Sequence, residues 1–223
     1  MKKHIEQSAA FMKSIGLAPD ASQMEKLDAY AALVLEKNRD FNLTAAADER
    51  EVWLRHLCDG AAALPLLRKL LGGKPTPLVA DAGAGAGYTG ITLKILWPEV
   101  SVLLLDSLSK RCAFMDWACA KLALASIKAV RLRLGQDKSS VQADVVLERA
   151  MGALEDIAGP CASVAGPGGY FIAYRSSPAP DCCPPPVPEL LALEQGHSLP
   201  LSYRLPEETQ DRSFAVYRKR APF

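Results

Sequence analysis

Several features that would indicate other classes of protein are scarce in this chain. Three histidines and six cysteines include no Cys-x-x-Cys pair, so we predict no metal site. Cys182 and Cys183 are adjacent, which strains an intramolecular disulfide, and we expect reduced, mostly buried thiols. No apolar run is long enough to cross a bilayer, and residues 1–6 lead into no signal-peptide core. The expectation is a cytoplasmic protein with no membrane partner.

An excess of charge of either sign is also missing. Lysine and arginine number 26 and aspartate and glutamate 25, so the net charge is +1. A nucleic acid would therefore have to bind a local patch of basic side chains, because the chain as a whole has almost no net positive charge to attract it. The candidate basic residues lie in three short groups: Lys110 and Arg111; Lys128, Arg131 and Arg133; and Arg218, Lys219 and Arg220.

Residues 78–90 contain what the chain is organised around: Leu-Val-Ala-Asp-Ala-Gly-Ala-Gly-Ala-Gly-Tyr-Thr-Gly. This pattern predicts a buried parallel strand, a turn whose glycines have positive φ angles, and a helix that begins against the turn. Residues 85–90 satisfy the dinucleotide fingerprint, whereas residues 81–87 resemble motif I of the S-adenosylmethionine-dependent methyltransferases. The Asp81 carboxylate suits the ammonium of a methyl donor and would repel a pyrophosphate. Asp106, which ends the next apolar run, suits ribose hydroxyls under either template, so an NAD-binding module remains the alternative.

The order of the segments favours the methyl donor. Residues 1–77 are predicted to form a helical N-terminal extension, with a capping box at residues 22–25. Residues 78–223 are predicted to form the methyltransferase core, in which strands alternate with helices, one of them capped by Ser109. After a proline-rich loop at residues 176–188, two apolar segments predict an antiparallel hairpin at the sheet edge. We therefore predict an α/β, Rossmann-like class I methyltransferase fold, mostly parallel with a C-terminal antiparallel strand.

More specific motifs lie on both sides of the glycines. They read Phe-Asn-Leu-Thr-Ala at 41–45, Arg-His-Leu-Cys-Asp at 55–59, Leu-Leu-Asp-Ser-Leu-Ser-Lys-Arg at 104–111, Arg-Ala at 149–150 and Gly-Pro-Gly-Gly at 166–169. Together they resemble the RsmG family, also called glucose-inhibited division protein B, over roughly residues 20 to 176. The resemblance implies S-adenosyl-L-methionine-dependent methylation of N7 of one guanine in 16S ribosomal RNA. The expected partner is that RNA or the small ribosomal subunit, and the expected state is a monomer.

The same resemblance assigns roles to residues. The cofactor would be bound by residues of the glycine turn and of the strand ends: Asp81, Gly83, Gly85, Tyr88, Asp106, Leu134, Gly135 and Arg149. The catalytic residues, facing the mouth of the site and the RNA, would be Asn42, His56, Arg149 and Arg175, with Arg55 beside them. The alternatives are purely structural roles: Arg149 forms an ion pair with Glu148 or Asp144, His56 is packed in the core, and Asn42 caps a turn.

The chain also departs from the family's usual pattern. Tyr-Thr-Gly at 88–90 stands where Phe-Pro-Gly is usual, Gly60 and Glu148 each where serine is usual, and Arg175 where lysine is usual. Glu148 is a carboxylate beside Arg149 that could neutralise it. The chemistry nevertheless agrees with an N7 target, because N7 carries a lone pair and needs no general base. The fourth strand lacks the Asn/Asp-Pro-Pro-aromatic turn that grips exocyclic amines. A methyltransferase of the same fold acting on another RNA or a small molecule is the enzymatic alternative.

Overall fold

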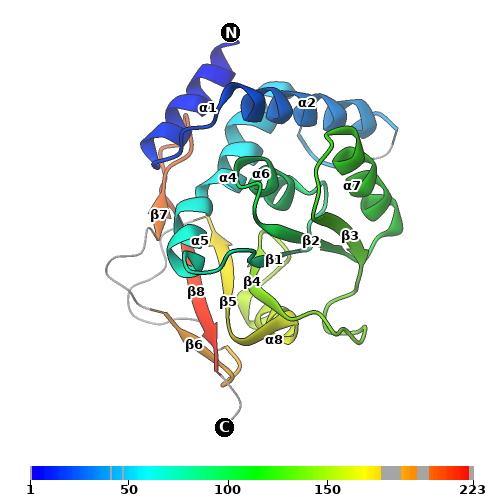
Figure 1. Cartoon of the computed structure of the whole chain (residues 1–223), viewed down its shortest axis with the longest axis vertical. Coiled ribbons are helices and arrows are strands. Elements are labelled where there is room, and N and C mark those ends of the chain that lie inside the picture. Colours follow the sequence, from blue (N-terminus) through cyan, green and yellow to red (C-terminus); the bar gives the residue numbers. More distant parts are fainter. Residues whose placement is uncertain (1, 41, 47, 177–186, 195–200, 221–223) are drawn as a thin grey trace.

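A mixed β-sheet forms the centre of the molecule (Figure 1). The computed structural model describes residues 2–40, 42–46, 48–176, 187–194 and 201–220. The sheet has eight strands in the order β3-β2-β1-β4-β5-β8-β6, and β7 pairs with β8. Its strands are β1 (Leu78–Ala82), β2 (Ser101–Asp106), β3 (Ile127–Arg131), β4 (Ala143–Glu148), β5 (Ala165–Arg175), β6 (Leu191–Leu193), β7 (Ser202–Tyr203) and β8 (Arg212–Lys219). Strands β1 to β5 are parallel and β8 runs antiparallel to β5, which confirms the predicted sheet.

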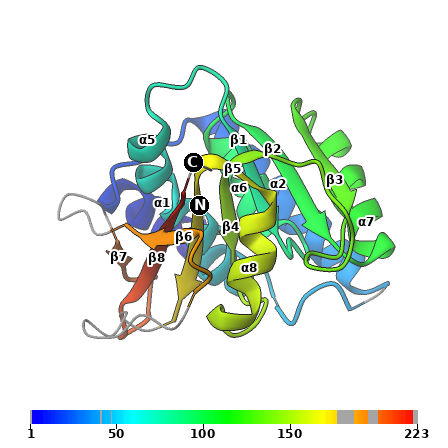
Figure 2. The same cartoon turned by 90° about the horizontal axis from the view of Figure 1, so that it is seen from below.

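Helices cover both faces of this sheet (Figure 2). They are α1 (Lys3–Ser14), α2 (Ala21–Asn38), α3 (Glu49–Glu51), the π-helical turn η1 (Val52–Leu57), α4 (Cys58–Ala62), α5 (Leu64–Leu71), α6 (Tyr88–Leu96), α7 (Ser109–Lys121) and α8 (Leu154–Val164). Helices α6 and α7 pack on one face, with the N-terminal helices outside them, and α8 packs on the other face. Two apolar cores result, one on each side of the sheet.

The N-terminal helices are tied closely to the glycine turn. The hydroxyl of Tyr30, on α2, donates a hydrogen bond to the carbonyl of Ala86 at 2.8 Å. A Cβ added at Gly60 would lie 2.9 Å from the carbonyl oxygen of Tyr88, so only glycine allows α4 to approach α6 this closely. Helices α3, η1 and α4 follow one another without a break, and this run brings residues 56 to 60 against the start of α6.

Two helices are capped by residues other than the predicted ones. The capping box of α2 is formed by Asp20 and Gln23, not by residues 22–25, because the Asp20 side chain accepts from the Gln23 amide and Gln23 bonds back. Ser109 is the first residue of α7 rather than its cap. The Asp106 carboxylate instead accepts from the Leu108 amide at 2.9 Å.

The C-terminal region agrees with the predicted hairpin where it is described. Strand β7 pairs with β8 in antiparallel fashion. Strand β6 was not predicted; it also pairs with β8, just after the proline-rich segment. Residues 177–186 lie outside the described part, and with them the prediction of a loop there and of thiols at Cys182 and Cys183. The four described cysteines, Cys58, Cys112, Cys119 and Cys161, are free and buried, as predicted. Within the described ranges, no helix has the length and apolar character needed to span a membrane.

Candidate active site

The glycine turn lies between β1 and α6 and has the predicted backbone. The φ angles of Gly83, Gly85 and Gly87 are 65°, 62° and 84°, in the left-handed region that favours glycine. A Cβ added at Gly85 would meet only the Gly83 carbonyl oxygen, at 3.9 Å. The backbone there is therefore open to close approach by a ligand, and α6 begins directly behind it.

Two carboxylates flank this turn at the carboxyl ends of neighbouring strands. Asp81 is 3% exposed and accepts a hydrogen bond from the Gly90 amide at 2.8 Å. Its burial raises its pKa to about 7. Asp106 accepts from the Gly85 amide at 3.0 Å through one oxygen and from Leu108 through the other. The oxygen bonded to Gly85 also accepts from Nη1 of Arg111, at 3.4 Å. The oxygen bonded to Leu108 keeps a further lone pair, so the carboxylate can still accept a hydrogen bond from a ligand.

The segment after β3 contributes the residues predicted to border the adenine. Leu134 is half-buried against the core under α8. Gly135 has φ 79°, and a Cβ added there would lie 3.0 Å from Cγ of Pro160 on α8. Both residues follow the carboxyl end of β3, two strands from β1, where open α/β sheets bind ligands.

A buried polar cluster stands on the other side of the turn and is centred on Asp59. This carboxylate, on α4, is 1% exposed. It accepts from Nη1 of Arg149 at 2.9 Å, from the hydroxyl of Tyr203 at 2.5 Å, and from Nη1 of Arg212 at 3.4 Å. One side chain thus joins an N-terminal helix, the end of β4 and the C-terminal hairpin. Neither Tyr203 nor Arg212 was predicted as a site residue, and Asp59 was quoted in a motif without a role.

His56 and Tyr88 form the aromatic wall of this cluster. Their rings are stacked, with centroids 4.2 Å apart and planes at 4°. The guanidinium of Arg149 lies 5.7 Å from the centre of the Tyr88 ring, and its Nη2 lies 3.3 Å from Nδ1 of His56. Burial, then the neighbouring Arg149, Arg55 and Arg212, lower the pKa of His56 to about 3, so the imidazole is neutral. Because a guanidinium only donates, Nδ1 accepts and the ring proton is assigned to Nε2.

The ion pair of Arg149 is not the one that the sequence offered. Arg149 pairs with Asp59 instead of Glu148 or Asp144. Asp144 pairs with Lys74 at the opposite end of the sheet. Glu148 is the last residue of β4 and lies on the face covered by α8, whereas Arg149 follows the strand and pairs with Asp59 on α4, on the other side of the sheet. The positive charge of Arg149 is therefore neutralised by Asp59, on α4, and not by its sequence neighbour Glu148.

The other two predicted catalytic residues lie apart from this cluster. Arg175 ends β5 on the face covered by α8, which is the face of Glu148. Asn42 is exposed after the end of α2. The turn that follows is held by Asn38, whose side-chain oxygen accepts from the amides of Leu43 and Thr44 at 2.8 and 2.9 Å. The structure thus places the side chains of His56, Tyr88 and Arg149 in contact with one another. The turn that Asn42 was expected to cap is held by Asn38 instead.

Comparison with known proteins decides the family. A model of the family described as rRNA small subunit methyltransferase G matches residues 23–181. The chain belongs to this family. It is 35% identical to ribosomal RNA small subunit methyltransferase G of Bordetella avium, over 73% of this chain and 72% of the relative. It is 31% identical to the protein of the same name from Staphylococcus haemolyticus, over 97% of this chain and 90% of the relative.

A solved structure shares the fold of this family member. TrmN from Thermus thermophilus superposes with a TM-score of 0.53 at 19% identity, covering 75% of this chain and 53% of TrmN. The chain thus spans about half the length of that protein. The predicted class I methyltransferase fold is confirmed, and the cofactor of this methyltransferase family is S-adenosyl-L-methionine. The turn fits it, because the Gly85 backbone is open and the Asp106 oxygen bonded to Leu108 keeps a free lone pair beside it.

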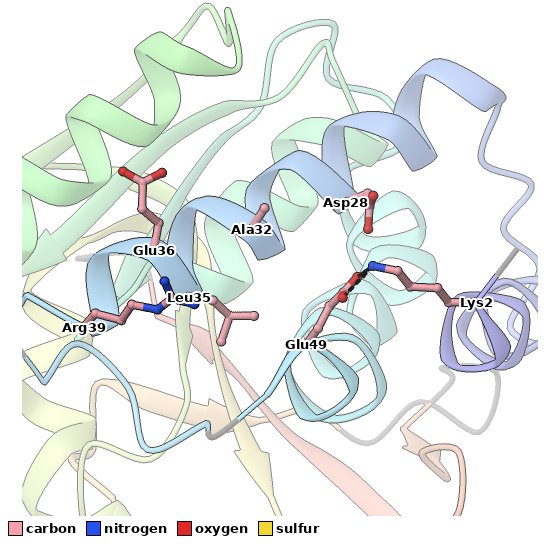
Figure 3. Close-up of a pocket in the computed structure, with 7 residues that line it drawn as sticks. All are labelled: Lys2, Asp28, Ala32, Leu35, Glu36, Arg39 and Glu49. Atoms are coloured by element: carbon pink, nitrogen blue, oxygen red, sulfur yellow. Dashed lines mark hydrogen bonds and ion pairs between the residues drawn. The ribbon is translucent and has the colours of Figure 1, made fainter.

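A separate pocket lies on the outer side of the N-terminal helices (Figure 3). It has a volume of about 300 Å³, and it contains none of the predicted site residues. Its lining comes from α1, α2, α3 and the residues beside them: Lys2, Asp28, Ala32, Leu35, Glu36, Arg39 and Glu49. Inside it, the ammonium of Lys2 donates to both carboxylate oxygens of Glu49, at 2.7 and 2.6 Å. Its acidic and basic groups thus partly satisfy each other.

Proposed function

We propose that this family member transfers a methyl group from S-adenosyl-L-methionine to N7 of a guanine in small-subunit (16S) ribosomal RNA. It would act in the cytoplasm as a monomer, on the RNA or on the small ribosomal subunit. The observation that carries the proposal is the family match over residues 23–181, which includes the N-terminal motifs as well as the glycine turn. The relatives that match over most of their length bear the name ribosomal RNA small subunit methyltransferase G.

The proposed cofactor contacts follow the strand ends. Asp81 faces the ammonium of the donor, and Asp106 accepts from its ribose hydroxyls. The turn at Gly83 and Gly85 provides the close backbone approach, and Tyr88 borders it at the start of α6. Leu134 and Gly135 form the edge against the adenine. Arg149 lies at the methyl end.

The proposed chemistry requires alignment rather than proton transfer. The bound donor supplies a methyl carbon attached to a positive sulfur; the N7 lone pair forms a bond to that carbon as the carbon–sulfur bond breaks. No proton leaves the guanine, so no general base is needed. This agrees with His56, whose pKa of about 3 makes it a poor base. We propose that His56 and Asp59 hold Arg149 against the base, while Arg175 and Asn42 face the RNA.

The proposal is tested on ribosomal RNA from cells that lack the protein. One guanine of the small-subunit RNA should become resistant to reduction and aniline cleavage, the reaction that reports N7-methylguanine. Purified enzyme and labelled donor should restore the cleavage on small subunits from those cells. If every N7-methylguanine persists in the deletion strain, the assigned substrate is wrong. Methylation of a metabolite extract instead of subunits would favour the small-molecule alternative.

The buried Asp81 predicts a pH dependence of donor binding. Its pKa of about 7 lies above the ordinary value of 3.8, so a bound ammonium must favour the ionised form. Donor affinity should therefore increase about tenfold from pH 5.5 to pH 7, a range in which an α-amino group stays protonated. Calorimetric titration over this range measures it. Asp81→Asn still accepts from the Gly90 amide, and it should bind more weakly and with a flat profile. A flat profile in the unmodified protein would mean that Asp81 does not face the donor.

A further inference from the structure

Two charged side chains, one buried and one half-buried, end neighbouring strands, and each has a buried polar atom without a hydrogen-bond partner. Glu148 ends β4 and is 1% exposed; one oxygen accepts from the Met151 amide at 2.6 Å. Among the described residues, its other oxygen, Oε2, has no hydrogen-bond partner, and neither has the buried Nη2 of Arg175 at the end of β5. Buried polar atoms without partners are rare and costly in proteins, so each needs an explanation.

The two side chains lie on the same face of the sheet but do not satisfy each other. Both lie on the face covered by α8, and β4 and β5 are parallel neighbours, with Glu148 in register with Ala173. Burial raises the pKa of Glu148, and the Met151 amide, then the charges of Arg175 and Arg149, counteract it. Within the described chain, however, no ion pair within 4.0 Å joins them. The carboxylate of Glu148 can accept hydrogen bonds and the guanidinium of Arg175 can donate them. This pair suits a ligand that has hydrogen-bond donors and an acceptor along one edge.

This edge of the sheet adjoins the glycine turn. The carboxylate of Glu148 holds the Met151 amide, and the Met151 side chain fills the position that a Cβ on Gly83 would occupy. Ala150, just before Met151, has φ 63°, a strained conformation for a residue with a Cβ. Glu148 is thus linked through Met151 to the glycine turn, and it is next in sequence to Arg149, the residue proposed for the methyl end of the donor.

Guanine has the matching pattern. Its base-pairing edge offers N1–H and the N2 amino group as donors and O6 as an acceptor, and enzymes that modify a base read this edge after extruding it. We propose that Glu148 and Arg175 read the target base, Glu148 accepting from N1–H and N2–H and Arg175 donating to O6. The proposal rests on the proposed guanine substrate and deepens it. Adenine would place its N1 acceptor against the carboxylate and its N6 amino group against the guanidinium, so the pair also rejects adenine.

The test is a double-mutant cycle in which the enzyme is varied at Glu148, the RNA is varied at the N2 amino group of the target base, and kcat/KM is measured for each combination. Small subunits are reconstituted with RNA that carries either guanosine or inosine, which lacks only N2, at the target position. The unmodified enzyme should lose about tenfold in kcat/KM on inosine, the loss expected when one hydrogen bond to a charged group is removed. Glu148→Gln should lose about 10- to 100-fold on guanosine and no more than about threefold further on inosine. Its side-chain oxygen still accepts from Met151, so the fold is kept.

Three controls separate the possible failures. Glu155→Gln, an exposed substitution in the first turn of α8, should match the unmodified enzyme on both substrates. Donor affinity measured by calorimetry should be unchanged in Glu148→Gln, and Arg175→Lys should lose kcat/KM on both substrates equally, because O6 is present in each. Equal factors for guanosine and inosine in Glu148→Gln, or a loss of donor affinity, would overturn the base-reading role. Failure of the unmodified enzyme to methylate guanosine subunits would instead overturn the proposed function.

Discussion

Replacing Asp59 by alanine is expected to reduce kcat/KM for methyl transfer at least about 100-fold and to lower the free energy of unfolding by about 3 kcal/mol. The buried carboxylate is the shared acceptor for Arg149, Tyr203 and Arg212. Alanine leaves two guanidinium groups without this partner, and loss of one partner of a buried pair typically costs 3–5 kcal/mol. The lower end applies because these arginine side chains remain 21% and 17% exposed. Urea unfolding and steady-state kinetics measure the two effects.

Two further variants distinguish the positioning role of Asp59 from general stability. Asp59→Asn keeps an oxygen for Tyr203 but removes the charge that aligns Arg149; it should lose less stability than alanine and still lose most of kcat, with the KM for donor nearly unchanged. Glu208→Gln removes the other carboxylate that Arg212 contacts, one that is 33% exposed. It should change stability by less than about 1 kcal/mol. If Asp59→Asn folds and keeps full kcat, Arg149 does not depend on Asp59 for its alignment.

The glycine turn could be predicted from the sequence because its determinants are local. The apolar run before Asp81, the alternating glycines and the helix that follows lie within 13 consecutive positions, residues 78–90. The positive φ angles of these glycines were expected and are observed, as is a mostly parallel sheet with a C-terminal antiparallel strand. Local signals also have a limit: the box at residues 22–25 satisfied the capping pattern with Ser22 as the cap, but the cap is Asp20, two residues earlier.

The Asp59 cluster could not be predicted because its contacts join distant parts of the chain. Arg149, Tyr203 and Arg212 lie 90, 144 and 153 residues from Asp59. Each has acidic or basic neighbours in sequence, so sequence alone offered Glu148 or Asp144 as partners of Arg149. Strand alternation decides against Glu148, because it places this last residue of β4 on the face covered by α8, whereas Arg149 follows the strand and pairs with Asp59 on the other side of the sheet. The same alternation separates the proposed base-reading pair from the Asp59 cluster, and it becomes informative only once the strand is paired in the sheet.

Replacing Asp106 by alanine is expected to reduce the affinity for S-adenosylmethionine at least about 100-fold. Two ribose hydroxyls that donate to one carboxylate contribute about 1.5–3 kcal/mol each, and every 1.4 kcal/mol is a factor of ten. The same substitution frees the amide of Gly85, which Asp106 holds at 3.0 Å, so the turn loses part of its preorganisation. Calorimetric titration with the donor measures the change. Asp106→Asn keeps an acceptor oxygen without the charge and should lie between alanine and the unmodified protein.

The matched control is Asp116→Ala. Its carboxylate accepts from the Ala129 amide at 2.8 Å, a bond of the same type between α7 and β3, but it is exposed and far along α7 from the strand ends. Donor affinity should stay unchanged there. A titration with NAD distinguishes the two templates that the glycine turn satisfies. NAD should not bind, because Asp81 beside the turn attracts an ammonium and repels a pyrophosphate. NAD binding as tight as that of the donor, weakened alike by Asp106→Ala, would mean that this turn holds a dinucleotide and that the charge of Asp81 does not select the ligand.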